Sequence, residues 1–117
     1  MRIKMLAAAL VLLFAGQQAA AQDAQPNAMV LAQAFDRCMA TQAVRLTRTA
    51  ATDAEILAQA RQSCQALNDQ FRAAVSAQLP AADAAEMLRS IDLQAEPNFM
   101  TLLTRIRSDR ARREGGQ

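Results

Sequence analysis

The chain has 117 residues and a formal net charge of +2, and it contains no histidine, tryptophan or tyrosine. It has no histidine and a single lysine, Lys4, so the residues that often act as general bases, metal ligands and Schiff-base nucleophiles are almost absent. No nucleophile-elbow motif or phosphate-binding glycine loop is present either. We therefore expect a small protein that is not an enzyme and needs no cofactor.

Residues 1–21 have the pattern of a secretory signal peptide. Arg2 and Lys4 precede an apolar run over residues 5–15, and small residues lead up to a cleavage site after Ala21. The run is shorter than the roughly 20 apolar residues that a membrane-spanning helix needs. We expect cleavage, no transmembrane segment in the rest of the chain, and export, to the periplasm if the source is a Gram-negative bacterium.

The remaining chain is predicted to be one small all-α domain. Alanine, leucine, glutamine and arginine dominate it, and these residues favour helices, whereas strand-favouring aromatic and β-branched residues are scarce. We expect a flexible segment over residues 22–27, a helical domain over 28–110 and a flexible basic tail over 111–117. Residues 22–104 hold six arginines against nine acids, and residues 105–117 hold five arginines against two acids. The body is thus mildly acidic and the C-terminal end basic.

The first two predicted helices form an antiparallel hairpin. A stripe of apolar residues behind Asn27, a favoured N-cap residue, predicts a helix over about residues 28–47. A capping box at Thr52–Glu55 starts a second helix over about residues 53–78. That helix should end there because Pro80 disfavours helical geometry at the residue before it.

Two shorter helices are predicted to pack against this hairpin. Pro80 suits the first turn of a helix, and the apolar pattern behind it predicts a helix over about residues 80–91. Pro97 is expected to open a last helix over about residues 97–110. Residues 92–96 would then be the connector between the two.

The hairpin contains the only two cysteines, and they lie at equivalent heights. Cys38 and Cys64 are each 13 residues from Ala51, so two helices of equal length bring them opposite each other. An even number of cysteines in an exported chain indicates a disulfide. Three apolar pairs share the same symmetry: Leu46 with Ile56, Phe35 with Leu67, and Leu31 with Phe71.

Other roles for the cysteine pair fit the sequence less well. Catalytic dithiols usually occupy a C-x-x-C motif at the start of a helix, and this pair is mid-helix and widely spaced. A Cu(I) site would need further soft ligands, for which the chain offers only scattered methionines, Met29, Met39, Met87 and Met100. Methionines on apolar stripes usually fill a core. We expect a structural disulfide and no metal site.

One polar residue interrupts the apolar stripe of the first helix. Gln42 lies among the inward positions, where an amide must find hydrogen-bond partners or reach the rim of the stripe. We expect a satisfied or half-exposed side chain, with a bound ligand as the alternative.

The C-terminal arginines are the one strongly charged feature. Five of them are candidates for docking to an anionic partner: Arg105, Arg107, Arg110, Arg112 and Arg113. No aromatic residues are interleaved with them, which argues against binding of single-stranded nucleic acid. The alternative is a solvated helix end whose arginines face the negative end of the helix dipole.

These features favour a non-catalytic exported protein that acts by protein interaction, or as a chaperone, in the cell envelope. Its apolar stripes on few helices would leave some apolar surface to bind a protein partner. The alternative is a carrier of a small molecule or metal in the hairpin core. A third hypothesis is an inhibitor or accessory subunit of an envelope enzyme.

Overall fold

The computed structural model describes residues 27–116, and this part of the chain consists of helices joined by short turns, without strands. The all-α prediction is confirmed. The predicted signal peptide and residues 22–26 lie outside the described residues. Within residues 27–116, no helix is both long enough and apolar enough to cross a membrane.

The hairpin begins where local capping signals predict it. Helix α2 covers Ala28–Leu46, and the side chain of Asn27 accepts a hydrogen bond of 2.9 Å from the Val30 N–H. Helix α3 covers Asp53–Ser63 and starts with the complete capping box. There the hydroxyl of Thr52 and the carboxylate of Glu55 each accept a 3.2 Å bond from the other residue's N–H. These bonds satisfy amides that the first helical turn leaves unpaired.

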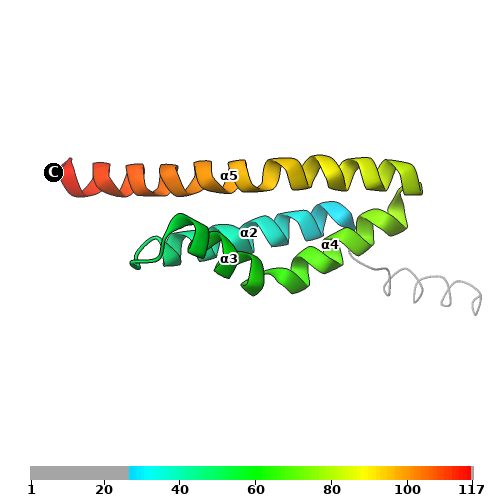
Figure 1. The fold of residues 1–117 in the computed structure, drawn as a ribbon, viewed down its shortest axis with the longest axis horizontal. Coiled ribbons are helices and arrows are strands. Elements are labelled where there is room, and N and C mark those ends of the chain that lie inside the picture. Colours follow the sequence, from blue (N-terminus) through cyan, green and yellow to red (C-terminus); the bar gives the residue numbers. More distant parts are fainter. Residues whose placement is uncertain (1–26, 117) are drawn as a thin grey trace, which may run out of the picture.

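The second predicted helix is not continuous. It is interrupted at Cys64, whose backbone (φ −104°, ψ 11°) departs from helical geometry, and it resumes as α4 over Gln65–Gln78. The single helix expected over residues 53–78 is therefore wrong in this detail. The break allows a change of direction, so that both α3 and α4 pack along α2 (Figure 1).

The two shorter helices predicted over residues 80–91 and 97–110 are in fact one. Helix α5 covers Ala81–Gly115, which is 35 residues, or about 52 Å at 1.5 Å per residue. Residues 92–96, predicted as a connector, are helical. The helix also continues into the segment that the sequence suggested would be a flexible tail.

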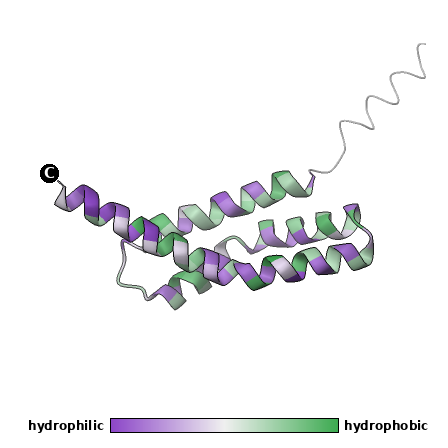
Figure 2. Cartoon of the chain, turned by 90° about the horizontal axis from the view of Figure 1, so that it is seen from above, coloured by the Kyte–Doolittle hydropathy of each residue, from purple (hydrophilic) through white to green (hydrophobic). Residues whose placement is uncertain are grey.

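Helix α5 tolerates Pro97 because the proline lies on the solvent side. Pro97 is exposed, and because proline has no N–H it leaves the carbonyl of Leu93 without its helical donor. Leu93 is also exposed, so water can take the place of that donor. Buried residues fasten the helix on both sides of the proline, with Ala84 before it and Phe99 and Leu103 after it. Seen from above in Figure 2, α5 changes direction along its length, as expected for a proline-containing helix.

The buried residues form two clusters along the molecule. The first joins α2, α3 and α5 through Ala43, Leu46, Ile56, Leu57, Ala60, Phe99 and Leu103. The second joins α2, α4 and α5 through Leu31, Phe71, Val75 and Ala84. In two of the predicted mirror pairs, both partners belong to the same cluster. Leu46 and Ile56 lie in the first cluster, and Leu31 and Phe71 lie in the second. Helix α5 runs along the other three helices and contributes to both clusters (Figure 1).

Candidate functional site

A groove of about 970 Å³ opens between the two core clusters, and we call it the central groove. Its walls are the middle of α2, the region around the α3–α4 junction, and the middle of α5. Large apolar side chains line it, among them Phe35, Met39, Leu57, Ile91, Phe99 and Leu102. Most of these are buried or half-buried, whereas Ile91 is 38% exposed. The central groove therefore has an apolar interior that is open to solvent.

Polar residues surround this apolar interior. Four charged side chains line the central groove: Asp36 of α2, Arg61 of α3, Asp69 of α4 and Asp92 of α5. Five neutral amides accompany them, namely Gln62, Gln65, Asn68, Gln94 and Asn98. All of these except the half-buried Asn68 are exposed. An apolar interior bordered by polar groups is typical of sites that bind a largely apolar ligand.

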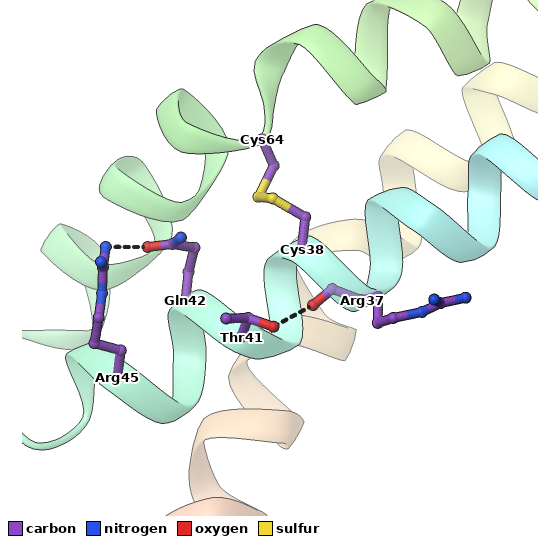
Figure 3. The surroundings of a disulfide bond; sticks show 6 residues. All are labelled: Arg37, Cys38, Thr41, Gln42, Arg45 and Cys64. Atoms are coloured by element: carbon purple, nitrogen blue, oxygen red, sulfur yellow. Dashed lines mark hydrogen bonds between the residues drawn. A yellow bond between two sulfur atoms is a disulfide. The ribbon is translucent and has the colours of Figure 1, made fainter.

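The predicted disulfide is present and joins two walls of the central groove. Cys38 of α2 and Cys64 are bonded, with Cα atoms 5.9 Å apart, inside the range that a disulfide requires. Figure 3 shows Cys64 at the point where α3 ends and α4 begins. Cys64 is 1% exposed. The bond therefore holds the α3–α4 junction against the middle of α2.

An ion pair links α4 to α5 beside the central groove. The guanidinium of Arg72 donates two hydrogen bonds, of 2.8 and 3.1 Å, to the carboxylate of Asp92. These bonds and the positive charge of Arg72 hold the pKa of Asp92 below its ordinary value. Both side chains are partly exposed, at 36% and 56%. The pair positions Asp92 at the edge of the groove.

The side chain of Gln42 in the apolar stripe of α2 has a hydrogen-bond partner. Its side-chain oxygen accepts a 2.6 Å hydrogen bond from Arg45 on the same helix, and the residue is half-buried (Figure 3). This confirms the satisfied, half-exposed amide that the sequence predicted. Gln42 does not line the central groove.

The five C-terminal arginines differ in the contacts that they make. Arg107 pairs with Asp53 at the start of α3, and Arg112 pairs with Asp109 of its own helix. Arg110 donates hydrogen bonds to the carbonyls of Val44 and Thr47 at the end of α2. Arg105 and Arg113 have no ion pair among residues 27–116 and are exposed. At least two of the proposed docking residues thus stabilise the fold.

The sulfur atoms considered for a metal site are not brought together. Both cysteine sulfurs are bonded to each other, so neither is a thiolate ligand. Met39 and Met100 pack against the first core cluster, whereas Met29 and Met87 are exposed on the surface. Among the described residues, no three Cys, Asp or Glu side chains are grouped as a metal site would require.

Sequence reasoning missed the contribution of α5 to the central groove. Asp92, Gln94 and Ala95 lie in the segment interpreted as a connector, and Ile91 lies next to it, yet all four line one wall. A signal was available, because apolar residues recur at spacings of three and four straight through Pro97: Leu88, Ile91, Ala95, Phe99, Leu102 and Ile106. This periodicity predicts one continuous helix face.

The sequence and the fold were compared with protein-family models, with curated proteins and with solved structures. None of these comparisons gives a match. The central groove, the disulfide that joins two of its walls and the charges around it are the observations from which a function can be inferred.

Proposed function

We propose that this protein is an exported, non-catalytic binding protein of the cell envelope that holds an apolar segment of another protein in the central groove. Such binding would serve either a chaperone-like role or a stable interaction with one partner. The observation that carries the proposal is the central groove itself, which leaves part of Phe35, Met39 and Ile91 open to solvent. Exposed apolar surface with a polar surround is typical of protein-interaction sites.

The disulfide supports export. Disulfides persist in oxidising compartments and are rare in the cytosol, where thiols are kept reduced. The Cys38–Cys64 bond fits the signal-peptide pattern of residues 1–21. Fractionation of cells that produce the protein, with N-terminal sequencing, tests this part directly. Export predicts a product in the envelope or medium that begins at Gln22, and a cytosolic product that keeps residues 1–21 would contradict it.

A pair of matched variants on α5 tests the role of the central groove. Ile91 lines the groove, whereas Leu93, two residues later on the same helix, is 68% exposed and does not line it. Ile91→Asp and Leu93→Asp therefore make the same chemical change at a groove position and at a control position. Because both side chains are exposed, we expect both variants to fold, which circular dichroism and thermal unfolding would verify.

The readout is aggregation of an unfolded client protein, followed by light scattering, with the oxidised protein present in increasing amounts. We expect the wild type and Leu93→Asp to suppress aggregation and Ile91→Asp to suppress it several-fold less. The added carboxylate would be buried against the apolar client without a hydrogen-bond or ion-pair partner. No suppression by the wild type, together with no partner captured from an envelope extract, would sink the proposal. Equal suppression by the two variants would move the site away from the groove.

A small-molecule carrier is the second candidate, and the size of the groove favours it. Its volume of about 970 Å³ is at the upper end of the roughly 300–1,000 Å³ typical of small-molecule pockets. Native mass spectrometry of the protein isolated from its own envelope distinguishes the two. A stoichiometric organic ligand that Ile91→Asp releases would favour the carrier over the protein-binding role.

A further inference from the structure

The charges around the central groove are unequal. Asp36, Asp69 and Asp92 line it, against Arg61 alone. Arg72, which lies outside the lining, is engaged by Asp92 through two hydrogen bonds. Even with Arg72 counted, the groove and its edge keep a net negative charge.

Two of the three carboxylates are available to a partner. Within residues 27–116, neither Asp36 nor Asp69 forms an ion pair, although the charge of Arg72 acts on Asp69 at longer range. Asp36 is on α2 and Asp69 is on α4, so the carboxylates occupy two different walls. Both are exposed at the edge of an apolar interior. A positive charge on a bound ligand would therefore meet a carboxylate without displacing an internal partner.

The walls also limit the conformation of a bound polypeptide. Residues 27–116 form helices and turns, so the groove offers no strand edge with which an extended backbone could pair. A segment that enters the apolar interior must satisfy its own backbone hydrogen bonds, and a helix does so. The neutral amides around the groove can donate to or accept from the polar side of such a helix.

We infer that the preferred occupant of the central groove is a cationic amphipathic helix of a partner protein. Its apolar face lies against Phe35, Met39 and Ile91, and lysine or arginine on its flank faces Asp36 and Asp69. This inference rests on the proposed function and specifies the chemistry of the partner.

Three fluorescent peptides of equal length test it. They share one amphipathic helical pattern and apolar face and differ only in their flanking residues, which are lysine, glutamine or glutamate. Fluorescence anisotropy with the oxidised protein measures the dissociation constant of each. For each charge engaged, we expect the affinity of the lysine peptide to exceed that of the glutamine peptide by a factor of about three or more. The glutamate peptide should bind most weakly. Raising the salt from about 50 to 500 mM should remove most of this difference, because it screens exposed charges.

A double variant locates the charge preference. Asp36→Asn with Asp69→Asn should bring the lysine peptide to the affinity of the glutamine peptide. The control, Asp83→Asn with Glu114→Gln, removes the same charge from exposed positions outside the groove and should leave the preference unchanged. An equal loss in both double variants would mean that only net charge matters, and it would overturn the inference.

The outcomes separate the inference from the proposed function. If the glutamine peptide binds and Ile91→Asp abolishes that binding, but lysine adds nothing, the groove binds helices and the cationic preference is wrong. If the glutamate peptide binds most tightly, Arg61 decides the specificity and the inference fails. If no peptide binds, or if Ile91→Asp has no effect, the proposed function fails as well. Self-association of the protein that the peptides compete with would instead assign the groove to a second copy of the chain.

Discussion

Arg110 of α5 donates hydrogen bonds to both the carbonyl oxygen and the hydroxyl of Thr47, 63 residues earlier, at 3.2 and 3.1 Å. The same guanidinium reaches the carbonyl of Val44 at 3.3 Å. The last carbonyls of a helix lack partners within it, and α2 ends at Leu46. Arg110 therefore caps α2 from a distant part of the chain and fastens α5 to the hairpin.

Arg110→Ala should lower the free energy of unfolding by about 1–2 kcal/mol, because charge-assisted hydrogen bonds are lost, two of them to the partly buried oxygens of Thr47. Urea denaturation followed by circular dichroism measures this. Arg113→Ala is the control, since Arg113 is exposed and makes no ion pair among residues 27–116. That variant should stay within about 0.5 kcal/mol of the wild type. Equal losses would show that only the basic charge of the helix end matters.

Removal of the disulfide should cost about 3.5 kcal/mol. The bond closes a loop between cysteines 26 positions apart, and the chain-entropy estimate for such a loop gives this figure. Cys38→Ala with Cys64→Ala should therefore unfold at a much lower urea concentration than the oxidised wild type. A reducing agent should destabilise the wild type and leave the double variant unaffected. A double variant as stable as the oxidised protein would show that the core alone holds α2 to the α3–α4 junction.

Pro97→Ala should stabilise the protein by about 1–2 kcal/mol. Alanine restores an N–H donor to the carbonyl of Leu93 and removes a helix-interior proline, which costs about 3 kcal/mol relative to alanine. A more flexible unfolded chain offsets up to about 1 kcal/mol of this gain. Pro80→Ala is the control, because Pro80 precedes α5 and interrupts no helical hydrogen bond. A gain at Pro80 equal to that at Pro97, or no gain at Pro97, would contradict this account.

The Arg72–Asp92 pair should make stability depend on pH in acid. The pKa of Asp92 is lowered below its ordinary value of 3.8 in the folded protein, so the pair stabilises the fold above about pH 4. That contribution is lost as the pH falls through the lowered pKa. Because both side chains are partly exposed, Asp92→Asn should cost only about 0.5 kcal/mol at pH 7, and progressively less as the pH falls through the lowered pKa. The same substitution in an Arg72→Gln background should show no such pH dependence, and a dependence that persisted there would assign the effect to another group.

Predictions from the sequence succeeded where the cause is local. Asn27 and the Thr52–Glu55 capping box start helices through bonds to residues three positions away, so a few letters suffice to recognise them. The register of Cys38 and Cys64 followed from equal distances to one turn. The predictions failed at Cys64 and Pro97, where packing against distant helices decides whether a helix bends, breaks or continues.

Local signals are enough to predict the helical class, the hairpin turn and the disulfide, because helix propensity, capping and residue spacing act over a few positions of the chain. Helix packing settled the rest: α3 and α4 separate at Cys64, Arg110 caps α2, and the apolar periodicity on both sides of Pro97 becomes one continuous α5. The reason is that each depends on contacts between residues far apart in the chain, such as Phe99 and Leu103 with the α2–α3 core. The central groove follows from the same contacts, since it is the space that remains between two core clusters joined by one long helix.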